Sequence, residues 1–459
     1  MPMEYERLIE LQRSFFSSGK SKNPDFRVAA LKKLLSLLRE HEAQLSEALY
    51  RDFGKSAPET YLTEFSFLYH DLNLFIRKLK RWSRRKRVPT NVANLPGRSF
   101  IYPEPLGAVL VIGTWNYPFQ LSLLPAIAAL AAGNCVIVKP GEAAPESSAA
   151  MARLINSNFD SAYFHVTEGG PETTQALLRH RFDKIFFTGS TRVGRIIYEA
   201  AARHLTPVIL ELGGKSPTIV LADADLKVAA RRIVWAKFLN AGQSCVAPDF
   251  LLVERPVKEA LLEALRKEIE KHHPQQDGLR DNYVQIVNAR HFERLKALLD
   301  REKLYCGGQA RSSSRIIDPT VLRNVSFDDP VMQEELFGPV LPVLAFDDLD
   351  EVLEKLKEMP KPLSCYVYGR HRGKIEKVLH TLSFGGGAVN ESMMHMANTR
   401  LPFGGVGSSG MGAYHGYAGF AAFTHFKSIL YKGFRFEVPL KYPPYKAWKM
   451  KILRFLLER

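Results

Sequence analysis

The chain has 459 residues, of which 46% are hydrophobic and 24% charged, and its formal net charge at pH 7 is +15. This length and composition indicate a soluble, globular protein of two or three domains. Thirteen of the 15 net charges lie in residues 77–88 and 441–459, and no RNP, KH, zinc-finger or helix-turn-helix motif accompanies them. We therefore expect no nucleic-acid partner, and we interpret residues 77–88 as a solvated surface.

The first 82 residues are predicted to be helical, because apolar residues recur at spacings of three and four. The amino terminus is charged from residue 4 onward and has no apolar stretch before a cleavage site, so no secretory signal is expected. Residues 83–101 are rich in Pro, Asn and Gly around one short β-prone piece. This composition predicts an extended arm or linker.

From residue 106 onward, apolar strands alternate with helices. A first set of strands ends with PVILEL near residue 211, and a second set runs from SPTIV to GGAVN. The apolar run 121–138 is interrupted by Pro125, Gly133 and Asn134, which predicts a buried helix followed by a strand and not a membrane span. Alternation predicts parallel sheets covered on both faces, so the expected class is α/β with two such domains.

The cysteines bear on compartment and metal content. They form no CxxC pair and have no histidine at metal spacing: Cys135, Cys245, Cys306 and Cys365. This pattern argues against a metal site and against a disulfide framework. We expect a reducing, cytoplasmic environment.

Two strand ends carry residues that suit a nucleotide. Gly189 and Gly194 lie in a strand-to-helix turn, where backbone amides can face a pyrophosphate, although such a turn is often only a turn. Lys139 and Glu142 follow another strand, where open parallel sheets bind ligands. They suit ribose hydroxyls or, as an alternative, form a surface pair.

Three further residues suit acyl chemistry. Cys245 lies in NAGQSCVAPDF, among small and polar residues that leave room for a ligand, although an isolated cysteine is often only packing. Glu211 ends an apolar strand, where partial burial raises the pKa of a carboxylate toward that of a useful base. Asn116, in GTWNYPFQ, offers an amide to an oxyanion, or forms a turn.

Seven motifs follow one another across about 300 residues: WNYP, the Lys139 and Glu142 pair, FTGSTRVG, ELGGK, GQSC, EELFGPV and LPFGGVGSSGMG. Their order resembles that of the aldehyde dehydrogenase superfamily over essentially the entire chain. The details GTWNYP, CVAPDF and SSGMGAYHG are similar to the class 3 or fatty aldehyde dehydrogenase branch. One departure is Gly407, where many members carry a lysine, and it puts the shape of the pocket rim in doubt.

The resemblance implies a role for each matching residue. Cys245 is the expected nucleophile, Glu211 the general base, and Asn116 with the Cys245 amide the oxyanion hole. The expected cofactor is NAD, with NADP as an alternative, and its contacts are Lys139, Glu142, Gly189, Ser190, Thr191, Val193, Gly194, Glu335 and Phe337. The expected substrate is an apolar aldehyde in a pocket formed by Tyr117, Trp235, Met393, Met394 and Phe403. No metal is expected.

The resemblance also implies two Rossmann-like parallel-sheet domains and a small β oligomerisation arm. We expect an NAD(P)-binding domain at 1–82 and 102–210, a catalytic domain at 211–420, the arm at 83–101 and 421–435, and a basic amphipathic tail at 436–459. We expect a homodimer, because the arm needs a partner to cover its strand edges.

The tail has two alternative interpretations. As a helix it places Trp448, Ile452, Phe455 and Leu456 on one face, with Lys449 and Arg459 elsewhere. It docks on its own protein near the substrate entrance, or it makes a peripheral contact with a membrane surface.

Two other functions are compatible with this fold. One is a CoA-acylating aldehyde dehydrogenase, in which the base is dispensable, and Glu211 argues against it. The other is a non-catalytic structural protein that keeps the fold, and the complete set of Cys245, Glu211 and Asn116 argues against that.

Overall fold

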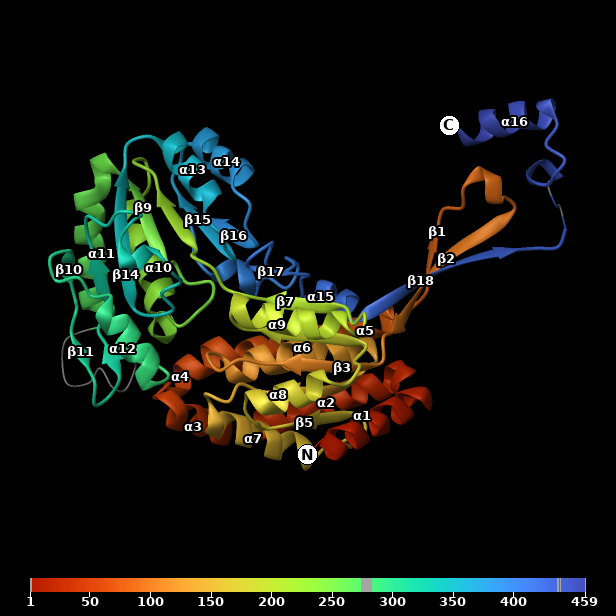
Figure 1. Cartoon of the computed structure of the whole chain (residues 1–459), viewed down its shortest axis with the longest axis horizontal. Helices are drawn as coiled ribbons and strands as arrows, with labels where there is room; N and C mark the ends of the chain where they lie inside the picture. The colour runs from red at the N-terminus through yellow and green to blue at the C-terminus, as the bar shows by residue number, and fades with distance from the viewer. Residues whose placement is uncertain (1, 274–282, 436, 438, 459) are drawn as a thin grey trace.

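The computed structural model describes residues 2–273, 283–435, 437 and 439–458. Two α/β lobes lie side by side, and a three-stranded arm projects away from them, with the C-terminal helix beyond the arm (Figure 1). Arg459 and the side chain of Leu456 lie outside the described part of the chain.

The first lobe contains a six-stranded sheet in the order β17-β7-β6-β3-β4-β5. Its strands are β3 (Ala108–Ile112), β4 (Cys135–Lys139), β5 (Phe164–Val166), β6 (Lys184–Thr188), β7 (Val208–Glu211) and β17 (Gly410–Met411). The first five are mutually parallel, whereas β17 runs antiparallel to β7. The parallel strands are nearly continuous apolar runs, as expected of a sheet buried on both faces.

Helices cover both faces of this sheet because successive strand residues point to opposite sides. Leu110 packs in one core cluster with residues of α1 (Pro2–Ser17), α8 (Pro171–Leu178) and α9 (Thr191–Ala202). Val109 and Val111 pack in another with α2 (Pro24–Glu40), α3 (Glu42–Phe53), α5 (Ser66–Trp82), α6 (Pro118–Ala132) and α7 (Pro145–Asn156). Every residue of α6 is buried, in agreement with a sequence that is apolar except for Gln120 and Ser122.

The second lobe contains a seven-stranded sheet in the order β10-β13-β14-β9-β8-β15-β16. Its strands are β8 (Pro217–Val220), β9 (Phe250–Glu254), β10 (Leu304–Cys306), β13 (Thr320–Leu322), β14 (Val340–Phe346), β15 (Ser364–Tyr368) and β16 (Gly386–Val389). Residues of α10 (Leu226–Phe238), α11 (Lys258–His272) and α12 (Ala289–Ala297) pack on one face, and residues of α13 (Leu349–Glu358) and α14 (Arg372–Thr381) on the other. The predicted α/β class with two parallel-sheet lobes is confirmed.

The arm is a separate sheet in the order β1-β2-β18. It consists of β1 (Lys86–Val88), β2 (Gly97–Pro105) and β18 (Thr424–Lys432), and β18 pairs with β2 from Thr424 opposite Pro105 to Lys432 opposite Gly97. The tail helix α16 (Ala447–Leu457) contacts the short helix η3 (Val92–Asn94) near the end of the arm (Figure 1). No described helix is both long and apolar enough to cross a membrane.

Three short strands differ from the sequence expectation of purely parallel sheets. β10 and β13 form an antiparallel pair at one edge of the second sheet, and β17 returns from near the end of the chain to the first sheet. Each has only two or three residues, so its pairing is decided by distant partners and not by its own pattern.

Candidate functional site

The turn that carries Cys245 follows helix α10. This turn includes the short helix η4 (Leu239–Gly242). Within η4, the left-handed φ values are 54° at Asn240, 52° at Ala241 and 72° at Gly242. A Cβ atom on Gly242 would lie 2.3 Å from the Gly338 carbonyl oxygen, so this position requires glycine. The turn redirects the chain and leaves the Cys245 thiol partly exposed.

The amide of Asn116 is held against this turn. Asn116 lies beyond the end of β3, and its Nδ2 donates to the Gln243 carbonyl at 3.1 Å. Asn240 Nδ2 donates to the Asn116 carbonyl at 3.0 Å. The Gln243 side chain in turn donates to the Gln285 carbonyl at 3.0 Å and accepts from the Val287 amide at 3.0 Å. Because an amide nitrogen carries two hydrogens, one N–H of Asn116 remains for another acceptor.

Glu211 ends β7, and its side chain is buried. Its backbone carbonyl accepts from the Gly189 amide at 3.0 Å, which fixes the strand end. Neither carboxylate oxygen accepts a hydrogen bond from a residue that the structure describes. Burial raises the pKa of Glu211 well above its usual range. The arrangement holds a carboxyl group whose affinity for a proton is unusually high.

The electrostatic surroundings of Cys245 favour the protonated thiol over the thiolate. Burial, followed by the negative charges of Glu335 and Glu211, raises the pKa of Cys245. Burial also raises the pKa of Glu335, to about 8, and lowers that of Lys237 to about 8. The residues of the site therefore keep the thiol protonated at neutral pH.

The predicted cofactor residues lie at one edge of the first sheet. β7, β6, β3 and β4 are neighbours and run parallel, so the residues that follow their carboxyl ends share that edge. Lys139 ends β4 and is buried, and its Nζ donates to Glu142 Oε2 at 2.6 Å. The Glu142 side chain is half exposed. A carboxylate that is oriented by a buried lysine suits the hydroxyl groups of a ribose.

Helix α9 begins at the same edge. Ser190 is its N-cap, and the Ser190 hydroxyl accepts from the Val193 amide at 3.4 Å. Thr191 Oγ1 donates to the Ser408 carbonyl at 3.1 Å. A Cβ atom on Gly194 would lie 2.7 Å from a methyl carbon of Leu212, so glycine allows the helix to approach the segment after Glu211. The first amides of a helix lack partners within it and attract anions such as a pyrophosphate.

Glu335 and Phe337 reach the site from the second lobe. A Cβ atom on Gly213 would lie 2.1 Å from Glu335 Oε2, so the carboxylate lies directly against this backbone. The Phe337 ring meets the Trp115 ring edge to face at a centroid distance of 5.5 Å. These residues, together with those at the sheet edge, fit an extended dinucleotide that spans both lobes.

The predicted substrate-pocket residues come from three segments. Tyr117 begins α6 and is buried, Trp235 lies on α10 and is partly exposed, and the chain after β16 carries the buried Met393 and the exposed Met394. Phe403 is buried, and its ring stacks on that of His415 at a centroid distance of 5.0 Å. Met393 and Phe403 belong to one core cluster and Trp235 packs against it, which gives the neighbourhood an apolar character.

Sequence reasoning missed three charged residues that lie beneath this site: Lys55, Glu59 and Glu64. Lys55 and Glu64 are completely buried, and Glu59 is hydrogen-bonded to the turn that leads to Cys245. Their only sequence signal is charge within a helical segment that is otherwise ordinary, and this does not distinguish them from surface residues.

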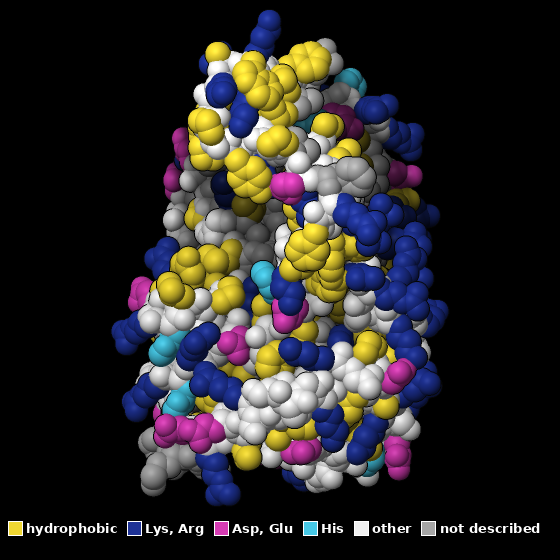
Figure 2. All heavy atoms as spheres, turned by 90° about the vertical axis from the view of Figure 1, so that its right-hand side faces the viewer, with side chains coloured by type: hydrophobic (Ala, Val, Ile, Leu, Met, Phe, Trp, Pro, Cys, Tyr) yellow, Lys and Arg dark blue, Asp and Glu magenta, His cyan; other side chains and the backbone are white. Residues whose placement is uncertain are grey.

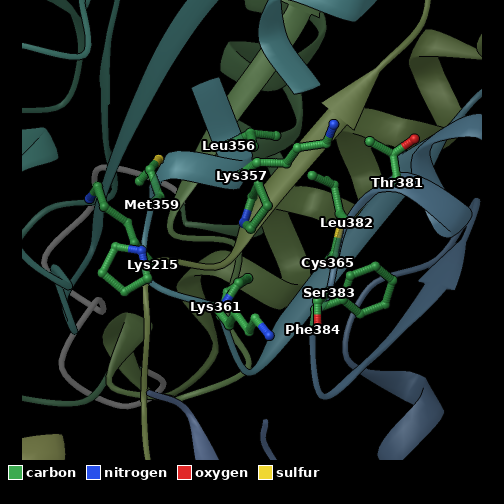
Figure 3. Close-up of a pocket in the computed structure, with 13 residues that line it drawn as sticks. Lys215, Leu356, Lys357, Met359, Lys361, Cys365, Thr381, Leu382, Ser383 and Phe384 are labelled. Atoms are coloured by element: carbon green, nitrogen blue, oxygen red, sulfur yellow. The ribbon is translucent and has the colours of Figure 1, made fainter. Parts of the chain in front are cut away.

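A separate cavity of about 120 Å³ lies at the start of β8 and β15 (Figure 3). Lys215, Lys357 and Lys361 line it together with Cys365 and Phe384. Lys215 is already bound to Asp249 at 2.5 Å, and Lys357 to Glu354 at 2.6 Å. No predicted site residue lines this cavity.

The model of the aldehyde dehydrogenase family matches residues 2–429. The chain belongs to the aldehyde dehydrogenase family. It is 45% identical to 4,4'-diaponeurosporen-aldehyde dehydrogenase of Staphylococcus aureus, with 96% of each chain covered. It is 42% identical to aldehyde dehydrogenase family 3 member B1 of Homo sapiens, over 97% of this chain and 96% of that protein.

The fold agrees with this assignment. The solved structure of substrate-bound Staphylococcus aureus AldH superposes with a TM-score of 0.96 at 44% identity, and 98% of each chain is covered. The resemblance inferred from the motifs is therefore confirmed. This aldehyde dehydrogenase is an NAD(P)-dependent enzyme that oxidises aldehydes to carboxylic acids.

Proposed function

We propose that this aldehyde dehydrogenase oxidises apolar aldehydes through a covalent bond to Cys245. The observation that carries this proposal is the hydrogen bond from Asn116 to the Gln243 carbonyl, which fixes an amide of the first lobe against the turn that presents the thiol. Glu211, whose charge acts on the pKa of Cys245, supplies a buried carboxyl group nearby.

Each of the three residues has a defined part in the reaction. The Cys245 thiol loses its proton to solvent, its sulfur forms a bond to the aldehyde carbon, and the electron pair of the carbonyl double bond moves to the oxygen, which becomes an anion. The free N–H of Asn116 and the Cys245 backbone N–H donate to that oxygen. When bound, NAD⁺ would supply a positive charge and accept the hydride that leaves the former aldehyde carbon, so that Cys245 is left acylated as a thioester.

Hydrolysis of the thioester requires a base. The Glu211 carboxylate takes a proton from water, the water oxygen bonds to the thioester carbon, and the carbon–sulfur bond breaks. The products are the carboxylic acid and the restored Cys245 sulfur. Because a CoA-acylating enzyme has no need of a base for water, the buried Glu211 favours hydrolysis over acyl transfer to CoA.

We propose NAD as the preferred cofactor and NADP as the alternative. Lys139, Glu142 and the first turn of α9 from Ser190 would hold the adenosine diphosphate part, and Glu335 and Phe337 the nicotinamide riboside. Glu142 supports the preference for NAD, because its carboxylate would repel a 2′-phosphate.

The substrate preference rests on the residues around the thiol. Tyr117, Met393 and Phe403 are apolar in body and buried, and methionine adapts its shape to flexible apolar chains. The Staphylococcus aureus relative is named for 4,4'-diaponeurosporen-aldehyde. We propose medium-chain to long-chain aliphatic or aromatic aldehydes.

The experiment that tests the proposed function is the Cys245→Ala substitution. We expect NADH formation from hexanal to disappear while NAD binding, followed by quenching of protein fluorescence, is retained. Analysis of wild-type products with and without CoA separates acid from acyl-CoA. Oxidation retained within about tenfold in the variant would exclude Cys245 as the nucleophile.

We also propose that the chain forms a homodimer through its arm. β18 is an edge strand of the arm sheet, and an unpaired edge invites a partner. The apolar side chains of Leu430, Tyr431 and Phe434 are exposed near it. Light scattering that reports the mass of one chain would contradict this.

The basic and apolar surfaces on the arm side support a peripheral membrane contact of a cytoplasmic enzyme. Figure 2 shows Lys and Arg side chains gathered in a band along this face and apolar side chains gathered at the top, where Figure 1 places α16. In the tail, Tyr445, Trp448 and Ile452 are exposed. All eight basic residues of 77–88 are also exposed.

A groove lies beside the segment that carries Met394. It has a volume of about 450 Å³, and its lining includes His70, Arg77, Lys78 and Arg400. Basic groups near a bilayer each add about 1 kcal/mol of attraction to anionic lipid. We therefore propose salt-sensitive association with anionic membranes, in which apolar aldehydes dissolve.

The four free cysteines support a reducing compartment.

A further inference from the structure

Three charged side chains lie between the first lobe and the turn that carries Cys245: Lys55 and Glu64, which are buried, and Glu59, which is partly buried. Lys55 and Glu64 are both completely inaccessible to solvent, and Lys55 Nζ lies 3.8 Å from Glu64 Oε1. The same ammonium lies 4.3 Å from the centroid of the Tyr117 ring. Removal of the two charges from water costs several kcal/mol per ion, before their mutual attraction is counted. A buried ion pair is therefore weak evidence that the two residues serve only to stabilise the fold.

One carboxylate of this group holds the Asn116 side of the site. Glu64 Oε2 accepts from the Gln120 amide at 2.8 Å, in the first turn of α6. Tyr117 is the N-cap of that helix, and Asn116 directly precedes it. Neither Tyr117 nor Asn116 caps the helix with its own side chain, so Glu64 supplies the acceptor that the helix start lacks.

The other carboxylate holds the Cys245 side. Glu59 Oε1 accepts from the Asn240 amide at 2.8 Å. Asn240 is a left-handed residue of the turn, and its side chain binds both the Asn116 and the Gln243 carbonyls. Glu59 therefore fixes Asn240, the residue whose side chain connects the Asn116 backbone to the Gln243 backbone.

We propose that Lys55, Glu59 and Glu64 are positioning residues for the oxyanion hole formed by Asn116 and the Cys245 amide. This inference rests on the proposed function of those two residues. Burial raises the pKa of both carboxyl groups, that of Glu64 to about 7, and the Lys55 charge opposes this effect and so favours the ionised form, which is a stronger acceptor than a neutral amide. The group touches neither substrate nor cofactor, and it acts through the two backbone amides that it binds.

The test separates reactions of the Cys245 sulfur that need an oxyanion hole from one that does not. Aldehyde oxidation and acylation by p-nitrophenyl acetate both form an oxyanion. Alkylation by iodoacetamide displaces iodide and forms none. Mass spectrometry of the Cys245 peptide measures the alkylation rate without interference from the other cysteines.

For Glu59→Ala we expect kcat for hexanal and the rate of ester acylation to fall together by about 10-fold to 100-fold. The KM values and the iodoacetamide rate should stay within about threefold of wild type. Glu59→Gln retains an acceptor for Asn240 and should recover most of the loss. Asp52→Ala is a matched control, because Asp52 accepts from the Glu146 and Ser147 amides at the start of α7, outside the site.

Two results would overturn the proposal. If alkylation falls with acylation, Glu59 holds the thiol and not the oxyanion hole. If neither acylation nor kcat changes, the group has no positioning role. Lys55→Met and Glu64→Gln provide the same comparison should Glu59→Ala fail to fold. Failure of the proposed function itself is recognised separately, by oxidation that survives Cys245→Ala.

Discussion

Asp71→Asn should stabilise the enzyme in alkaline solution. Asp71 lies on α5, its side chain is 4% exposed, and burial raises its pKa from 3.8 to about 7. The folded state therefore favours the protonated carboxyl group more strongly than the unfolded state does. The stability that this preference contributes is complete at pH values below the unfolded pKa and is lost as pH rises through the folded pKa. Asparagine resembles the protonated acid in shape and does not ionise.

The magnitude follows from the size of the shift. A rise of about three pKa units corresponds to about 4 kcal/mol between strongly acidic and alkaline solution. The unfolded chain ionises first, so part of this loss has already occurred at about pH 5, and about 3 kcal/mol remains between about pH 5 and about pH 8. Wild type should lose this amount relative to Asp71→Asn over that interval.

The assay is urea unfolding of both proteins at the two pH values and at one protein concentration, followed by circular dichroism. The difference between the proteins isolates Asp71, because every other titrating group, including Glu64 and His415, is present in both. If the free energies of unfolding of the two proteins change in parallel with pH, the carboxyl group of Asp71 is not held protonated by burial and the reasoning is wrong.

The other predictions concern catalysis, cofactor and membrane. Glu211→Gln should leave a burst of NADH in stopped-flow absorbance and slow the steady rate that follows, because the base acts on the hydrolytic water; an equal fall of both would assign Glu211 another role. Glu142→Ala should raise kcat/KM for NADP relative to NAD by about tenfold, through removal of a like charge, and an unchanged ratio would refute its proposed place at the ribose. Deletion of residues 441–459 should abolish co-sedimentation with anionic vesicles and alter the rate with long aldehydes more than with short ones; unchanged vesicle binding and substrate profile would exclude both interpretations of the tail.

The local sequence determined most strands of both sheets and most of their helices. Runs such as Ala108–Ile112 and Val340–Phe346 are short and apolar throughout, as expected of strands in a sheet that is covered on both faces. The motifs also identified the family. Each motif is a turn or a strand end that needs particular residues, such as glycine in the turn before Cys245 or Glu211 at the end of its strand, and these residues can be read from the sequence directly.

Only the tertiary structure decided which of these local pieces meet. Asn116 and Gln243 are 127 positions apart, and Glu59 and Asn240 are 181 apart, yet one hydrogen bond joins each pair. Lys55 and Glu64 have the residue types of surface positions and lie completely buried, with Lys55 over the Tyr117 ring and Glu64 bound to the Gln120 amide at the start of α6. Short strands such as β10 and β17 have too few residues to show a period, so distant partners select their pairing. The pKa of each buried acid also depends on the solvent that the assembled fold excludes, and a sequence pattern does not contain that quantity.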